Sequence, residues 1–209
     1  MGSSNAVAEA GSPVGSVREI RRLKTRARLF DAALAEIGRC GLAGADVSAI
    51  ANAAGVVRGT FYFHFPTKEH VLVELQRNEE IRIVAELDHA QAETGDLSSV
   101  LSQLVRHVIA AERRLGPMVF RGMLGLHFSA ARPAEDQLSE HPLAEFVIAA
   151  ITDARAAGRV PAEANASELG VFFMTGLFAL LATGTQDSTT ADAVMDRYVM
   201  TIVKGMETR

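Results

Sequence analysis

The sequence predicts an all-α protein: a three-helix N-terminal unit followed by a larger helical domain, about nine helices in total. Two observations predict this fold class. Apolar residues recur at the spacing of helix faces along nearly the whole chain, and Gly or Pro residues separate these segments. We expect the N-terminal unit at 17–68 and the second domain at 69–209.

Residues 1–16 differ in composition from the rest of the chain. They are small, polar and interrupted by Gly and Pro, which predicts a disordered N-terminal arm. The single cysteine, Cys40, excludes a disulfide framework, and a small buried side chain is a more ordinary role for it than that of a nucleophile. With no secretory signal in the sequence, we expect a cytoplasmic protein.

The net charge of −4 conceals an uneven distribution. Residues 16–70 hold nine Lys and Arg against five Asp and Glu, a balance of +4, whereas residues 71–209 have a balance of −7. A basic N-terminal third on an acidic body is expected when one end of a protein meets a polyanion. Charged helix faces are usually just solvated, so the charge alone does not identify this partner.

The N-terminal unit begins with two helices. Apolar residues at helical spacing over 29–37 predict the first helix, which ends near Gly41. A second, short amphipathic helix follows at about 47–54, and Asp46 is placed to cap it. Gly55 then supplies the permissive backbone that a tight turn between two helices needs.

The stretch RGTFYFHF, residues 58–65, determines the character of this unit. As a strand, it would place alternating aromatic rings on one face, as in RNA-recognition domains. The neighbouring sequence supplies no partner strands, and Gly55 and Pro66 bound the segment as they would a short helix. We therefore predict that it is the second helix of a helix-turn-helix at about 46–65.

This helix has two different faces when its residues are placed 100° apart. One face is expected to lie against the core: Val57, Phe61, His64 and Phe65. The other face points outward: Arg58, Gly59, Tyr62 and Phe63, with Thr60 at the edge. Neighbouring exposed aromatic residues are costly on an ordinary surface, whereas DNA offers phosphates to Tyr, thymine methyls to Phe and guanine edges to Arg. The pattern therefore predicts a recognition helix.

The segment AIANAAGVVRGTFYFHFPTKEHVL, residues 49–72, resembles the DNA-binding domain of TetR-type (TetR/AcrR) transcriptional regulators. The resemblance extends over about 23–83 and implies a homodimer that binds double-stranded DNA at a palindromic operator. It implies phosphate contacts from three of the positions and base contacts from two more. The residues that it places at the DNA are Arg58, Gly59, Thr60, Tyr62, Phe63, His64 and Lys68.

Two departures from the family pattern affect affinity rather than fold. Val57 replaces the usual Ser or Thr that caps the recognition helix, a loss of about 1 kcal/mol. Ala45 and Asp46 stand where hydroxyl residues that reach phosphate are common.

The second domain is predicted from periodicity and turn signals. Thr67 can cap its first, long helix. The expected helices span about 68–94, 96–113, 117–131, 142–157, 166–184 and 189–206.

Residues 169–185 carry no charge and are apolar around the whole helix. A membrane span needs about 20 such residues, so a helix buried between its own domain and a twin subunit is favoured. With the last helix it would form a four-helix interface between two subunits. The expected interface residues are Gly176, Ala179, Thr183, Val194 and Tyr198.

The middle helices suggest an apolar pocket for an inducer, as the family resemblance implies. His127 lies near the centre of an apolar face, and it is either a core histidine or a hydrogen-bonding group for a ligand. A small apolar molecule with one polar end suits the surrounding residue types. The candidate lining residues are Leu104, His107, Phe120, Met123, His127, Phe146, Phe172 and Met174.

Motifs of catalysis are missing: the sequence has no HExxH, GxSxG, CxxC or P-loop, and its histidines are not spaced as metal ligands. We expect no enzyme, no metal and no cofactor. The most favoured function is a repressor released from DNA by a small molecule, and the alternative is a DNA-binding regulator of the same fold without an inducer. Activation instead of repression stays open, since it depends on where the operator lies.

Overall fold

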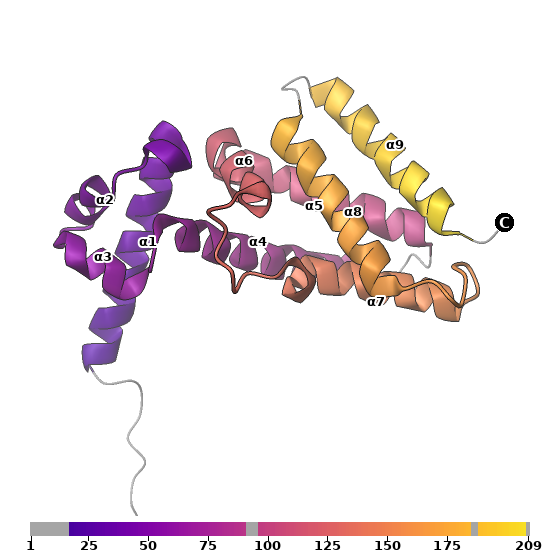
Figure 1. The fold of residues 1–209 in the computed structure, drawn as a ribbon, viewed down its shortest axis with the longest axis horizontal. Coiled ribbons are helices and arrows are strands. Elements are labelled where there is room, and N and C mark those ends of the chain that lie inside the picture. Colours follow the sequence, from indigo (N-terminus) through magenta and orange to yellow (C-terminus); the bar gives the residue numbers. More distant parts are fainter. Residues whose placement is uncertain (1–16, 91–95, 185–187, 208–209) are drawn as a thin grey trace, which may run out of the picture.

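The computed structural model describes residues 17–90, 96–184 and 188–207, which hold α-helices, short 3-10 turns and no strands. This confirms the all-α fold class (Figure 1). The predicted arm at 1–16 lies outside the described residues. The helices are α1 (Val17–Gly44), α2 (Val47–Ala53), α3 (Arg58–His64), α4 (Lys68–Ala90), α5 (Leu97–Leu115), α6 (Pro117–Gly125), α7 (Pro142–Ala156), α8 (Ala166–Thr183) and α9 (Ser188–Met206).

The first three helices enclose a small core of their own. It consists of Leu29, Ala33, Ile50, Ala54, Phe61, Phe65 and Val71, all buried. The turn between α2 and α3 depends on Gly55, whose φ of 69° is favourable only for glycine. Asp46 caps α2 as predicted, because its carboxylate accepts a hydrogen bond from the Ser48 amide at 2.9 Å.

Helix α1 joins this small core to a second, much larger one. Its middle residues Leu29 and Ala33 face α2 and α3, whereas Ile37 belongs to the large core. At Gly41 the backbone leaves the helical conformation with a φ of 74°, so the helix is kinked there rather than continuous to Gly44. The later part of α1 packs against α6, where Val119 lies beside Gly38 and Met118 beside Gly41.

Helix α4 leads from the N-terminal unit into the second domain (Figure 1). Arg26 of α1 holds it through a two-pronged ion pair with Glu74. The same guanidinium lies 4.4 Å from the centre of the Phe65 ring, so one side chain links α1, the end of α3 and α4. The predicted end of α4 at Thr94 lies outside the described residues.

Helices α5, α6 and α7 pack against α4, α8 packs on α6 and α7, and α9 packs on α5 and α8, so that together they form the large core (Figure 1). The predicted helix at 117–131 is too long. Helix α6 ends at Gly125, a 3-10 turn covers Leu126–Phe128, and the Ser129 amide closes that turn on the Leu126 carbonyl. Residues 128–131 are exposed and Pro133 disfavours helix at the residue before it, so no burial supports a longer helix.

Helix α8 is long and apolar enough to span a membrane by length and composition alone, but a third of it is already buried inside the subunit. The large side chains that it buries are Phe173, Met174, Leu177 and Phe178. Its opposite side is exposed, with Phe172 60 % accessible. Within this chain the helix is therefore a core element with one uncovered apolar side.

Candidate DNA-binding surface and ligand-domain core

Helix α3 is anchored by its aromatic residues on one side only. Phe61 and Phe65 are fully buried, and their rings lie 5.7 Å apart between the centroids, with Phe30 of α1 next to Phe65. A helix of seven residues is too short to be stable alone, so this packing fixes both its position and its orientation.

The opposite side of α3 faces outward. Phe63 is 75 % exposed and Tyr62 is 45 % exposed. Arg58 donates a hydrogen bond to the Tyr62 hydroxyl at 3.2 Å, which holds both side chains on the outer face. A Cβ atom on Gly59 would meet no atom within 4 Å, so the subunit itself does not require glycine there.

The prediction that Val57 faces the core is wrong: the side chain is 75 % exposed. Val57 precedes the helix with extended backbone angles, so helical periodicity does not apply to it. The predicted loss of a cap is confirmed, because no side-chain hydrogen bond caps α3. Thr60 is half-buried at the edge of the helix.

Two of the predicted DNA-binding residues also make internal contacts. The Lys68 ammonium group donates hydrogen bonds to the carbonyls of Ala43 and Ala45, at 3.1 and 3.2 Å, and thereby caps the end of α1. His64 stacks edge-on against Phe63, and its buried Nδ1 atom has no partner among the described residues. Burial, and then the charges of Arg26 and Arg22, lower the pKa of His64 below its ordinary value.

The second domain contains a chain of buried polar side chains. His127 Nε2 donates to Gln76 Oε1 at 2.8 Å, and Gln76 Nε2 donates to Glu80 Oε1 at 2.6 Å. His141 then bridges two carboxylates, with Nδ1 3.0 Å from Glu80 Oε1 and Nε2 2.7 Å from Asp136 Oδ1. Gln76, Glu80 and His141 are all at most 3 % exposed. The chain therefore links α4, the turn after α6 and the start of α7.

The two histidines of this polar chain are in opposite protonation environments. Burial, then the positive charges of Arg132 and His141, lower the pKa of His127 to about 3, so it is neutral. Burial would also lower the pKa of His141, but its hydrogen bonds and ion pairs with Glu80 and Asp136 outweigh this and raise it. His141 can therefore donate from both ring nitrogens.

Most of the predicted pocket residues are packed together without room for a ligand. The cavity beside them has a volume of about 10 Å³, about the room of one water molecule, and Phe120 and Met123 line it with Gln76, Leu143 and Phe178. His127 is not one of the lining residues, but its ring lies against that of Phe178, with 4.9 Å between the ring centroids. Leu104 and Met174 are fully buried, and Phe146 packs against the same core.

Two of the predicted pocket residues lie elsewhere. Phe172 does not face this core: it is on the exposed side of α8, because periodicity in a helix that is apolar all round does not reveal which side is covered. His107 faces α4, with Nε2 4.0 Å from a Glu86 carboxylate oxygen and Nδ1 2.9 Å from the Gln103 carbonyl.

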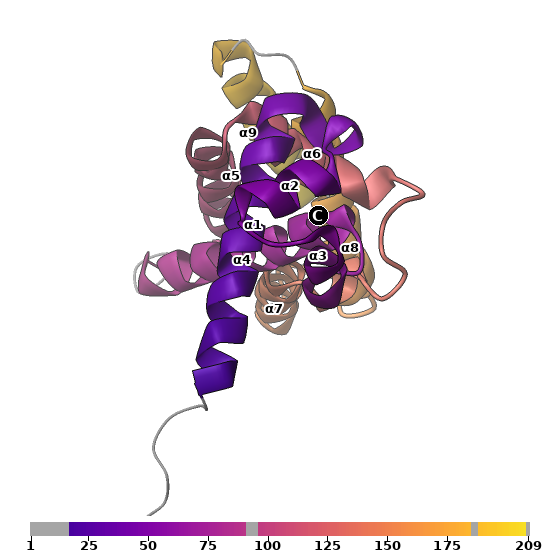
Figure 2. The same cartoon turned by 90° about the vertical axis from the view of Figure 1, so that its left-hand side faces the viewer.

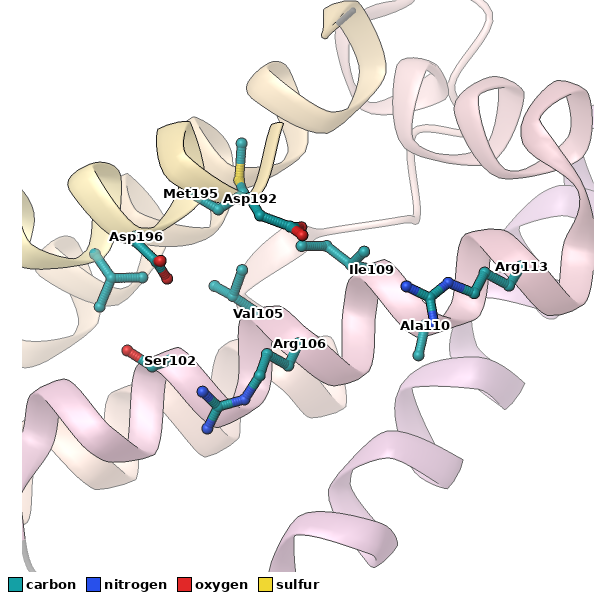
Figure 3. A pocket seen from close by; sticks show the side chains of 10 residues that line it. Ser102, Val105, Arg106, Ile109, Ala110, Arg113, Asp192, Met195 and Asp196 are labelled. Atoms are coloured by element: carbon teal, nitrogen blue, oxygen red, sulfur yellow. The ribbon is translucent and has the colours of Figure 1, made fainter. Parts of the chain in front are cut away.

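A larger, open cavity of about 400 Å³ lies between α5 and α9 (Figure 3). Its apolar floor includes Val105 and Ile109 of α5 and Met195 of α9. Two arginines of α5 and two aspartates of α9 also line it: Arg106, Arg113, Asp192 and Asp196. The sequence prediction did not include this groove.

Two of the predicted dimer-interface residues contact each other inside the subunit. The Tyr198 hydroxyl donates to the Phe173 carbonyl at 2.5 Å, and a Cβ atom on Gly176 would come within 2.5 Å of that hydroxyl. Gly176 therefore allows α8 and α9 to pack. Of the remaining three, Thr183 is exposed, whereas Ala179 and Val194 are half-buried.

Sequence reasoning missed the polar chain of the second domain, although a signal was present. Gln76 and Glu80 are four residues apart and follow the same side of α4 as Leu72, Ile83 and Leu87. Polar residues in an otherwise apolar helix face predict buried partners. Within residues 17–90, 96–184 and 188–207, no His, Cys, Asp and Glu side chains are grouped so that they could hold a metal ion.

Comparison with known proteins identifies the N-terminal unit. Residues 29–75 match the family model described as bacterial regulatory proteins, tetR family. The chain is 34 % identical over 87 residues to the HTH-type transcriptional regulator AcrR of Shigella flexneri, covering 41 % of this chain and 40 % of that protein. It is 32 % identical over 120 residues to the HTH-type transcriptional repressor KstR of Mycolicibacterium smegmatis, covering 57 % of each chain. The matched segments thus span about half the length of these relatives or less.

A solved structure shares the fold of most of the chain. The crystal structure of Thermus thermophilus FadR, a TetR family transcriptional repressor in complex with lauroyl-CoA, has a TM-score of 0.68 at 20 % identity, covering 88 % of this chain and 96 % of that one. At this identity the likeness shows the fold alone. The match of the helix-turn-helix, the two relatives and the shared fold agree with one another: residues 29–75 form a unit of the tetR family of bacterial regulatory proteins, and the chain has the fold of a TetR family repressor.

Proposed function

We propose that the protein is a DNA-binding transcriptional regulator: a homodimeric repressor that a mainly apolar small molecule releases from a palindromic operator. The outward face of α3 carries this proposal. Phe63 is largely exposed and Tyr62 keeps 45 % of its surface accessible, and a DNA groove is the surface that such residues fit.

On DNA, the outward residues of α3 have two proposed roles. Arg58 and Phe63 read base edges in the major groove, whereas Thr60 and Tyr62 contact phosphates. Gly59 has open space around it, which supports a close approach of the DNA backbone to the helix. Lys68 has a third N–H in addition to the two bonded to α1, and we assign this one to a phosphate.

Dimerisation is proposed through the uncovered sides of α8 and α9. Phe172 and Met200 are 60 % and 50 % exposed, and together with Ala179 and Thr183 they give an apolar surface that a second copy would cover. Two-fold symmetry would then present one α3 from each subunit to successive major grooves, about 34 Å apart. This geometry requires a palindromic operator.

The inducer is proposed to bind beside His127. His127 Nδ1 and Arg132 Nη2 are buried polar atoms without a partner among the described residues. Because the His127 imidazole is neutral and donates from Nε2, its Nδ1 can only accept a hydrogen bond. A hydroxyl group both donates and accepts, so it suits the polar end of the ligand better than a carboxylate. The apolar part would displace side chains around the small cavity between α4, α6 and α8.

Two mechanical connections lead from this cavity to α3. Helix α4 carries Gln76 and Glu80 in the second domain and Glu74, the partner of Arg26, near α1. Helix α6 carries Phe120 and Met123, and its start packs on α1 at Gly38. A ligand that separates α4 from α6 would rotate the N-terminal unit. It weakens DNA binding only by the difference between its affinities for the rotated and the DNA-bound conformations.

The groove between α5 and α9 supports a second location for the ligand, because its volume of about 400 Å³ lies in the ordinary range for small-molecule sites. A regulator without any ligand is the alternative function. Substitution at His127 distinguishes the site beside His127 from the groove between α5 and α9, since His127 does not line the groove.

Selection of bound duplexes from random-sequence DNA by the purified protein tests the proposed function. We expect enrichment of one imperfect palindrome with half-sites about one helical turn apart. Enrichment of no sequence, or of a single half-site, would refute the dimeric DNA-binding account.

A further inference from the structure

The first turns of α1, residues 17–28, extend beyond the core of the N-terminal unit, and we call them the overhang. Val17, Ile20 and Leu23 are 66 %, 41 % and 52 % exposed, and the first fully buried residue of the helix is Leu29. Figure 2, which looks onto α2 and α3, shows the overhang extending past α3 and away from α9. No described part of the subunit explains why so much helix is exposed there.

The arginines of the overhang fall into two groups. Arg22 pairs with Glu19 on the same helix, and Arg26 pairs with Glu74 of α4. The charges of these two arginines are therefore largely neutralised within the subunit. They lie on the same side of α1 as the core residues, and the Arg26–Glu74 pair ties this helix to α4.

The second group consists of Arg18, Arg21 and Arg28, which we call the basic stripe. Placed 100° apart, these residues and Thr25 fall within an arc of about 80°. Arg18 and Arg21 are exposed, and their side chains have no ion pair or hydrogen bond with another residue of the described chain. Arg28 donates only to the hydroxyl of Thr25, at 3.5 Å. The stripe is thus a row of uncompensated positive charge.

The basic stripe begins at the proposed recognition surface. Arg28 Nη1 lies 3.9 Å from the point where a Cβ atom would stand on Gly55. Gly55 is in the turn that leads from α2 into α3, only a few residues before Arg58. From this turn the stripe continues along α1 to Arg18. The stripe therefore runs from the turn before α3 to the first turn of α1.

We propose, on the basis of the proposed function, that the basic stripe binds backbone phosphates of the DNA that flanks each half-site. From Arg28 to Arg18 the helix rises about 15 Å, which corresponds to four to five base pairs at about 3.4 Å each. The overhang points away from α9, so in a dimer formed through α8 and α9 it lies at the outer ends of the operator. The stripe adds affinity without reading sequence.

Two duplexes test the proposal, both built on the palindrome selected by the wild-type protein. One ends at the palindrome, and the other adds about six base pairs of arbitrary sequence at each end. The wild type is expected to bind the longer duplex at least tenfold more tightly. The variant Arg18→Gln/Arg21→Gln should lose this preference yet bind the short duplex within about twofold of the wild type. Its salt slope on the long duplex should fall by about two to four units, for two phosphates per subunit.

A matched control removes the same charge elsewhere. Arg77→Gln/Arg82→Gln changes two exposed arginines of α4 and should keep the full preference for the long duplex. If both double variants lose the preference for the long duplex equally, the preference depends on the total charge of the protein and not on the stripe, which would overturn the proposal. So would a flank preference that persists in Arg18→Gln/Arg21→Gln. A wild-type protein that selects no palindrome would instead refute the proposed function itself.

An anionic membrane is the other polyanion that an exposed basic helix can meet. The exposed apolar residues Ile20 and Leu23 lie on a different side of the overhang from the stripe, and Val17 borders it. Binding of the wild type to phosphatidylglycerol vesicles that is lost in Arg18→Gln/Arg21→Gln, with the flank preference unchanged, would assign the stripe to lipid and overturn the DNA proposal.

Discussion

His127 Nε2 lies 2.8 Å from the side-chain oxygen of Gln76, and this contact gives the histidine a structural partner inside the second domain. The same ring leaves Nδ1 buried and unpaired. The sequence allows two roles for His127, that of a core histidine and that of a ligand-binding group. Nε2 fills the first role through Gln76, and Nδ1 is free to fill the second.

We predict that His127→Leu lowers the free energy of unfolding by about 1–3 kcal/mol, because the buried Gln76 oxygen loses its donor. The variant should still bind the operator, but it should need more inducer for release than the wild type. Chemical denaturation and operator titration with inducer measure the two effects. The double variant Gln76→Leu/His127→Leu serves as a control, because it removes the unpaired oxygen and should recover part of the stability. Unchanged sensitivity to inducer in His127→Leu would move the ligand to the groove between α5 and α9.

The raised pKa of His141 predicts a pH-dependent contribution to stability. Glu80 and Asp136 favour the charged ring, so the contribution is complete below about pH 6.5, the unfolded value, and is lost as pH rises through the raised pKa. His141→Gln should therefore lower the melting temperature more at about pH 5.5 than at about pH 9. An equal or larger loss at high pH would contradict the charged state assigned to His141.

His127 has the opposite dependence, since its pKa of about 3 lies below the unfolded value. Its contribution is present above about pH 6.5 and is lost as pH falls towards 3, because the buried ring must then accept a proton. The pH series is therefore best measured in the His127→Leu background as well. The His141 effect should persist there with the same sign.

The contact between Gly176 and Tyr198 predicts a coupled pair. Gly176→Ala would press a methyl group against the Tyr198 hydroxyl, and we expect a loss of about 1–3 kcal/mol. In a Tyr198→Phe background the nearest atom is gone, so the same substitution should cost less. Denaturation of the four proteins of this cycle gives the coupling energy, and purely additive losses would refute the contact.

The uncovered side of α8 predicts the response of the dimer to a buried charge. Ala179→Glu should place an unpaired carboxylate in the interface and shift the protein from dimer to monomer. Sedimentation velocity without DNA measures this, with Glu168→Ala, an exposed position at the start of the same helix, as the control. A wild-type protein that sediments as a monomer would refute the proposal that a dimer places one α3 in each of two successive major grooves.

Helix α3 was predictable because its boundaries and its packing are both local. Gly55 and Pro66 delimit it, and the spacing of Phe61 and Phe65 identifies the buried side. The positions of Val57 and Phe172 were not predictable in the same way. Val57 precedes the first helical residue, and Phe172 belongs to a helix whose apolar residues do not distinguish the two sides.

Contacts between segments that are distant in the sequence were also not predictable. The polar chain from His127 to Asp136 passes through Gln76, Glu80 and His141, which are far apart in the sequence. Lys68 was expected only at a phosphate, but its ammonium group also caps α1 through two carbonyls. Such partners depend on how the helices meet, which periodicity within one helix does not specify.

The central claim is that the outer face of α3 reads DNA sequence, and affinities for all single-base variants of the selected palindrome test it most directly. Arg58→Ala should lose about 1–3 kcal/mol of discrimination at one position of each half-site and keep the others. Lys68→Ala is the matched comparison: it should weaken binding to every variant alike, once denaturation has shown how much stability the lost α1 cap removes. If Arg58→Ala instead weakens all sequences equally, with no position relaxed, α3 is not the reading helix and the account is contradicted.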